Sequence, residues 1–138
     1  MAVIAQDSKE KIYLVGQDRY AVGNIYSWEV VTGSLKKGDN PLRKAKQELE
    51  EETGLLAKKW IRLGYFYPLN GYSSEKCFVY LAEDLTVAKA NPEATENITV
   101  KKKSLKEILK MIKENKITCG MTVAVVNKFL LYKNKINL

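Results

Sequence analysis

Short apolar runs interrupted by turn-forming residues divide the 138-residue chain into distinct segments. Six of these runs are rich in β-branched and aromatic residues, which is typical of β-strands. The predicted strands are Val3–Gln6, Lys11–Gly16, Ser27–Thr32, Trp60–Tyr67, Lys76–Ala82 and Asn97–Lys102. The polar stretch Thr86–Thr95 predicts a loop.

Helical patterns occupy other segments. The first helix is predicted over Pro41–Thr53, because Asn40 can cap its start and Gly54 can end it. A second helix begins with a capping box formed by Ser104 and Glu107, and its apolar residues share one stripe. That stripe consists of Leu105, Ile108, Leu109 and Ile112.

A third helix is predicted over about Met121–Tyr132. No repeat, low-complexity tract or linker interrupts residues 1–138, and a chain of this length can bury one core. We therefore expect a single domain of the α/β (α+β) class, with one mixed β-sheet and helices packed against it.

Composition narrows the function classes. No apolar run approaches the roughly 20 residues that span a bilayer, and no basic leader opens the chain, so we expect a cytoplasmic protein without a membrane partner. Cys77 and Cys119 lie far apart and indicate neither a zinc site nor a disulfide framework. Histidine is absent, so catalysis would depend on carboxylates, lysines, tyrosines or a metal.

The net charge of +7 favours an anionic partner, either a phosphorylated small molecule or nucleic acid. No arginine-aromatic stripe accompanies the lysines, so the sequence does not favour nucleic acid. Scattered lysines also serve simply to keep a protein in solution.

Three acids of the first helix, Glu48, Glu51 and Glu52, are spaced i, i+3 and i+4 and share one arc of its surface. The adjacent apolar stripe, which would press the helix onto the sheet, consists of Leu42, Ala45 and Leu49. Crowded carboxylates are best tolerated beside a cation, and their hard oxygen atoms suit Mg²⁺ or Mn²⁺ and hence phosphate chemistry. The alternative is a solvated acidic face balanced by lysines such as Lys44.

The surroundings of this helix favour the metal site. Residues 33–55 read GSLKKGDNPLRKAKQELEEETGL, and this stretch resembles the Nudix box, G-x5-E-x7-R-E-U-x-E-E-x-G-U, where U is a bulky aliphatic residue. The matching positions are Gly33, Glu48, Leu49, Glu51, Glu52, Gly54 and Leu55. The chain is thus similar to the Nudix hydrolases, which implies their α/β/α sandwich.

Two box positions differ, because Asp39 replaces the glutamate and Gln47 replaces the arginine. The resemblance implies a site for Mg²⁺, or else Mn²⁺, in which the helix acids are both metal ligands and catalytic residues. The implied ligands are Glu48, Glu51, Glu52 and the carbonyl group of Gly33. Asp39 and Gln47 would support the loop and helix less firmly, so we expect reduced or altered activity rather than none.

Beyond the box, the chain resembles the ADP-ribose pyrophosphatase branch of the family. Lys11–Tyr20 is similar to its strand and Gln-x-Arg-Tyr turn, and Tyr65–Lys76 to its aromatic loop. This implies cleavage of ADP-ribose to AMP and ribose 5-phosphate, although Asn70 stands near the place of a branch proline, with Pro68 nearby. The N-terminal strands through which many members dimerise are lacking, so a homodimer would use another surface.

A carboxylate has to take the proton of the attacking water. Glu96 is the first candidate, with Glu93 and Glu75 behind it, whereas Ala94 occupies the place of another family acid. The predicted substrate-binding residues are Arg19 and Lys37 for phosphate, Trp28 and Tyr72 for stacking on the base, and Glu75. Core packing is the alternative role for the aromatic side chains.

Other activities stay open at this point. A related enzyme could act on a dinucleoside polyphosphate, NADH, a nucleotide sugar or a nucleoside triphosphate. The changes at Gln47 and Ala94 also suit a sensor that binds a nucleotide with little catalysis. An RNA-binding or RNA-decapping protein would require an affinity that falls steeply with salt.

Overall fold

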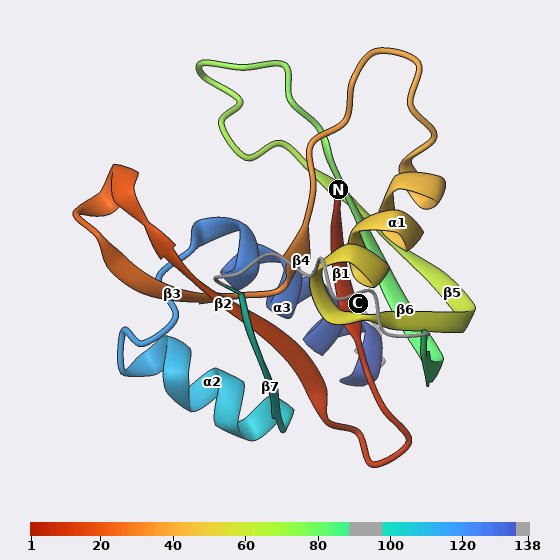
Figure 1. Ribbon diagram of the computed structural model, residues 1–138. Helices are drawn as coiled ribbons and strands as arrows, with labels where there is room; N and C mark the ends of the chain where they lie inside the picture. Colours follow the sequence, from red (N-terminus) through yellow and green to blue (C-terminus); the bar gives the residue numbers. More distant parts are fainter. Residues whose placement is uncertain (89–97, 135–138) are drawn as a thin grey trace.

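The computed structural model describes residues 1–88 and 98–134. Within these residues the chain forms two β-sheets, three α-helices and one short 3-10 helix (Figure 1). The strands are β1 (Ala2–Ala5), β2 (Ile12–Arg19), β3 (Ile25–Glu29), β4 (Val31–Thr32), β5 (Leu55–Phe66), β6 (Cys77–Val87) and β7 (Thr99–Lys103). The helices are η1 (Tyr20–Val22), α1 (Pro41–Thr53), α2 (Leu105–Lys113) and α3 (Gly120–Asn134).

The first sheet is mixed and has the strand order β4-β1-β6-β5. In it β1 runs parallel to β6 and antiparallel to β4, while β5 and β6 form a long antiparallel hairpin. The second sheet, with the order β3-β2-β7, is antiparallel throughout. None of the helices in the described part of the chain is long and apolar enough to cross a membrane.

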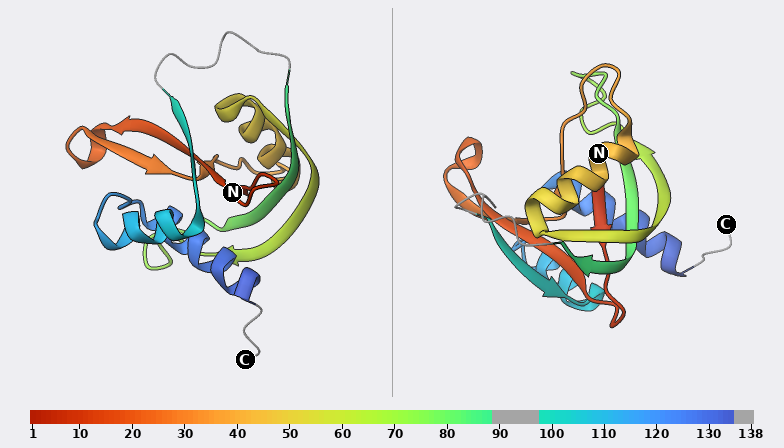
Figure 2. Two further views of the ribbon diagram at one scale, coloured as in Figure 1. Left: turned by 90° about the horizontal axis from the view of Figure 1, so that it is seen from below. Right: turned by 45° about the vertical axis from the view of Figure 1, so that its right-hand side comes forward.

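Alternating side chains of β1 build the core on both faces of the first sheet. Ile4 belongs to a buried cluster with Phe129 of α3, whereas Val3 belongs to a second cluster with Leu49 of α1. Figure 2 shows α1 and α3 on opposite sides of β1 and β6. The expected α/β/α layering is thereby confirmed.

The structure corrects the expectation of one sheet. Ser27–Thr32, predicted as a single strand, divides at Val30, so that β3 lies in the second sheet and β4 in the first. Val30 is fully buried and donates its N–H to the hydroxyl of Thr122 at 3.3 Å. α1 packs against the first sheet, and Arg19 and Glu29 of the second sheet lie near enough to Glu52 to influence its charge.

Several strand boundaries also differ from expectation, and the differences are largest in the β5–β6 hairpin. β5 begins at Leu55 rather than Trp60, because its first residues pair with the end of β6. For the same reason Thr86 belongs to a strand rather than to the predicted loop Thr86–Thr95. Residues 89–97, which include most of that loop and the candidate bases Glu93 and Glu96, lie outside the described residues.

Candidate functional site

The helix that carries the three acids is defined by local interactions. Asn40 Oδ1 accepts the N–H of Arg43 at 3.0 Å, and Pro41 occupies the first turn. Gly54 ends the helix in the left-handed conformation, with φ of 70°, and its N–H donates to the Glu50 carbonyl at 2.8 Å. These signals set the ends of the helix. Burial of Ala45 and Leu49 sets the face that it turns to the sheet, and the acids lie beside that face.

Glu52 is the one of the three acids with a buried carboxylate oxygen that lacks a hydrogen-bond partner among the described residues. This oxygen is Oε2, which is inaccessible to solvent. Burial, together with the negative charges of Glu48 and Glu29, raises the pKa of this carboxyl group to about 7. A hydrogen bond from the Thr32 backbone and the charge of Arg19 oppose the rise in pKa. An unpartnered buried oxygen in an acidic setting is suited to a cation.

Glu48 packs against the loop that precedes α1. A Cβ atom added to Gly33 would lie 2.5 Å from Glu48 Cγ and 2.8 Å from its Oε1, so only glycine leaves room for this carboxylate. On its other side, Oε1 is 2.8 Å from Nζ of Lys44. The Gly33 carbonyl, which the sequence suggests as a metal ligand, accepts a hydrogen bond from the Met1 amino group at 2.9 Å.

Glu51 is exposed, and its Oε1 accepts a hydrogen bond from Gln47 Nε2 at 2.7 Å. Across residues 1–88 and 98–134, no three acidic or cysteine side chains are already gathered closely enough to hold a metal ion. Glu48 contacts Lys44 instead, and Glu51 is bonded to Gln47. The donor set itself fits a hard divalent cation, since it offers carboxylate oxygens, a buried unpartnered oxygen and a close-packed glycine.

An ion pair between a half-exposed arginine and a buried glutamate contributes to the charge around Glu52. Arg19 donates from Nε to Glu29 Oε1 at 2.9 Å and from Nη2 to the other carboxylate oxygen. Glu29 is only 4% exposed, and sequence reasoning missed it. A glutamate inside the apolar run Trp28–Val31 was the available signal, because a charged residue in a buried strand needs a partner.

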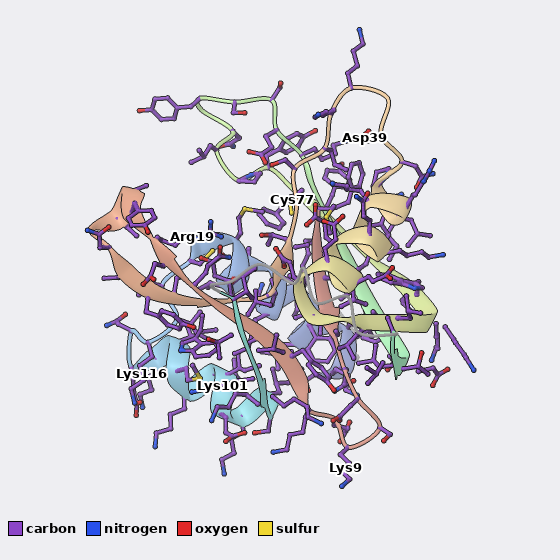
Figure 3. The ribbon with its side chains drawn as sticks, viewed as in Figure 1. Lys9, Arg19, Asp39, Cys77, Lys101 and Lys116 are labelled. Carbon is purple, nitrogen blue, oxygen red and sulfur yellow. The ribbon has the colours of Figure 1, made fainter. Side chains whose placement is uncertain are left out.

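Beside this pair lies a mainly apolar cavity of about 410 Å³. Its walls come from η1, β3 and the start of α3, and Arg19 is labelled in Figure 3. The apolar lining includes Val22, Ile25 and Met121, and the polar lining includes Ser27 and Thr118. A flat apolar group next to an anionic one would therefore find matching surfaces here.

The loop between β4 and α1 borders a second cavity, of about 700 Å³. Lys37 and Glu75 both line it, so the structure brings these two predicted substrate-binding residues together.

Tyr72 is 96% exposed in the turn between β5 and β6. Asp39 Oδ2 accepts the Lys36 N–H at 2.7 Å, which closes the loop locally without an arginine partner (Figure 3).

Trp28 is not brought to the acids. It neighbours Glu29 on a strand whose side chains alternate, so the two point to opposite faces of the second sheet. Trp28 packs against the core cluster that contains Ile108 of α2, and the ammonium group of Lys101 lies 4.8 Å from its ring (Figure 3). Its surroundings are those of a packing residue.

The chain is similar in sequence to known proteins. The family model of the NUDIX domain matches residues 1–118. The chain is 34% identical over 128 residues to the ADP-ribose pyrophosphatase of Bacillus subtilis (strain 168), and the alignment covers 91% of this chain and 69% of that protein. It is 33% identical to the methanol dehydrogenase activator of Bacillus methanolicus, with the same shares covered.

Solved structures share the fold at low sequence identity. A crystal structure of an ADP compounds hydrolase superposes with a TM-score of 0.82 at 17% identity, covering 99% of this chain and 75% of that one. A NUDIX hydrolase from Nitrosomonas europaea gives a TM-score of 0.73 at 16% identity, covering 96% and 87%.

Proposed function

The chain belongs to the Nudix family of pyrophosphohydrolases, and we propose that it cleaves ADP-ribose to AMP and ribose 5-phosphate in a metal-dependent reaction. The observation that carries the proposal is the buried, unpartnered Oε2 of Glu52, which lies on the same helix arc as Glu48 and Glu51. The resemblance to a named ADP-ribose pyrophosphatase at 34% identity supports the choice of substrate.

Glu48, Glu51 and Glu52 would hold Mg²⁺ or Mn²⁺, with a backbone carbonyl near Gly33 as a further ligand. A divalent ion bound there would neutralise the diphosphate and make its phosphorus more open to attack by water. Gly33 would leave room for the Glu48 side chain, and Asp39 would hold the loop in place.

The Arg19 guanidinium, fixed by Glu29, would bind a phosphate oxygen of the substrate. The apolar cavity beside it would receive the nucleoside, with Ile25 and Met121 against the base. Lys37 and Glu75, across the second cavity, would contact the other half of the substrate. Tyr72 and Trp28 have weaker support as stacking residues, since one is almost fully exposed and the other packs against the core.

The proton of the attacking water would pass to a carboxylate on a loop near the helix acids. Glu96 stays the first candidate and Glu93 the next, and both lie outside the described residues. Glu75 is exposed and lines the same cavity as Lys37, so it is the candidate that the described part of the chain offers.

A nucleotide sensor is the second candidate function. The observation that favours it is Gln47, which stands where the box has arginine and makes only a neutral contact to Glu51. A sensor would bind ADP-ribose in the apolar cavity and leave it intact. Measurable nucleotide binding without any product would support this reading.

The proposed substrate is tested by incubating the protein with Mg²⁺ or Mn²⁺ and a panel of nucleoside diphosphate derivatives. We expect ADP-ribose to be cleaved fastest, with AMP and ribose 5-phosphate identified by mass. Faster cleavage of a dinucleoside polyphosphate, NADH, a nucleotide sugar or a nucleoside triphosphate would refute the substrate assignment but keep the reaction type.

A further inference from the structure

Lys44 lies one helical turn before Glu48, and its ammonium group contacts an oxygen that the proposed metal needs. We propose that Lys44 is an internal cation that competes with the divalent metal for Glu48 and so lowers the metal affinity of the site. This inference rests on the proposed function, because it concerns the same carboxylates.

The contact is close and partly shielded from solvent. Lys44 Nζ lies 2.8 Å from Glu48 Oε1, and the two side chains are 25% and 15% exposed. Attraction to Glu48 raises the pKa of Lys44, with smaller contributions from Glu51 and Asp39. The lysine is therefore charged at neutral pH and lies within the field of the acids.

Glu48 Oε1 has a second close neighbour besides Lys44. Its carboxylate lies against the Gly33 backbone, where even a methyl group would come within 2.8 Å of Oε1. Oε1 therefore lies close to both the Gly33 backbone and the Lys44 ammonium group. A metal ion that binds Glu48 has to share this oxygen with the Lys44 ammonium group or displace that group. Either alternative costs free energy.

Lys44 is distinct among the cations around these acids. In the part of the chain that the structure describes, it makes the one ion pair to Glu48, Glu51 or Glu52. Glu51 is bonded instead to the neutral Gln47, which cannot repel a metal as a full charge does. Lys46, two residues further along, lies on an exposed part of the helix and forms no ion pair within the described residues.

The size of the effect follows from Coulomb's law. A unit charge about 5 Å from a divalent ion in water-like surroundings changes the dissociation constant by roughly tenfold once salt screening is included. A tenfold change corresponds to about 1.4 kcal/mol. We therefore expect Lys44→Gln to bind Mg²⁺ and Mn²⁺ roughly tenfold more tightly than the wild type.

The experiment measures binding of the metal alone by calorimetry, with no nucleotide present, and the rise in melting temperature with metal as a second readout. Lys44→Arg keeps the charge and should retain the wild-type affinity. Lys46→Gln removes one charge from the same helix without removing a contact, so its affinity should stay within about twofold of the wild type. Circular dichroism verifies that each variant is folded.

Three results would overturn the inference. Equal tightening in Lys44→Gln and Lys46→Gln would show a general effect of net charge rather than competition at Glu48. Unchanged affinity in Lys44→Gln, with clear binding by the wild type, would remove the role of Lys44 and leave the proposed function intact. No metal binding by the wild type or any variant would overturn both.

Discussion

Replacing Glu52 by glutamine should stabilise the metal-free protein. The substitution keeps the shape of the side chain and removes a charge whose Oε2 is buried without a partner. Raising a carboxyl pKa from 4.5 to about 7 corresponds to roughly 3 kcal/mol. Solvent reaches part of this half-buried side chain and screens some of that cost, so we expect a gain of about 1–2 kcal/mol in the free energy of unfolding above pH 7.

The pH dependence of this gain has a definite sign. Because the pKa of Glu52 is higher in the folded protein, the folded state binds more protons between pH 4.5 and about 7. The stability that comes with the neutral carboxyl group is complete below that window and is lost as the pH rises through about 7. The advantage of Glu52→Gln should therefore be small near pH 4.5 and largest above 7.

Urea unfolding in the presence of a chelator measures this difference at both ends of the pH window. Glu50→Gln is the matched control, since Glu50 lies on the same helix and is exposed. Its stability should change by less than about 0.5 kcal/mol. The reasoning would be refuted if Glu52→Gln were no more stable than the wild type above pH 7, or if the control gained equally. Either result would show that the buried charge of Glu52 does not destabilise the metal-free protein.

Further substitutions test the remaining parts of the site. Gly33→Ala should cost about 1–3 kcal/mol of stability and weaken metal binding, because its Cβ would collide with Glu48. Gly71→Ala is the control: no atom lies within 4 Å of the added Cβ, so stability and metal affinity should both stay unchanged. Arg19→Met leaves Glu29 buried without its partner and should cost about 2 kcal/mol in urea unfolding, and an unchanged midpoint would show that the pair contributes nothing. Ile25→Asp in the apolar cavity should raise KM for the nucleotide substrate severalfold, with a smaller effect on kcat. Leu56→Asp, at an exposed position on β5, should leave KM unchanged. Equal effects of the two substitutions on KM would place the nucleoside elsewhere.

Local sequence signals correctly predicted the first and last residues of some elements. Pro41–Thr53 is the helix in both sequence and structure, because Asn40, Pro41 and Gly54 act through contacts within a few residues. The start of β5 could not be predicted in the same way. Its first residues, from Leu55 to Lys59, include exposed and charged positions, and pairing with β6 rather than intrinsic preference makes them a strand.

The same distinction separates the predicted and unpredicted parts of the site. Helical spacing alone places Glu48, Glu51 and Glu52 on one arc. The partner of Glu29 depends on the pairing of β2 with β3. Val15 lies opposite Glu29, and Arg19, four residues further along β2 and opposite Ile25, projects from the same face as Val15. Alternation predicts that Trp28 and Glu29 face opposite ways, but the sequence does not tell which face meets α1.

Asp39 and Gln47, the two residues that depart from the Nudix box, each make a contact close by in the chain. Asp39 uses its shorter side chain to accept the Lys36 N–H within the loop. Gln47 donates to Glu51 one helical turn away, which keeps a contact without a charge. These contacts are local and could have been proposed from spacing, whereas the contact between Gly33 and Glu48 required the fold.

The central claim is that the acids of α1 act together on a pyrophosphate through a divalent metal. It is tested most directly by measuring ADP-ribose hydrolysis against Mg²⁺ concentration for the wild type, Glu52→Gln and the control Glu50→Gln, with products identified by mass. We predict AMP and ribose 5-phosphate from the wild type and the control, no reaction without metal, and turnover lowered by at least about 100-fold in Glu52→Gln. Undiminished turnover in Glu52→Gln, or hydrolysis that persists in a chelator, would contradict the account.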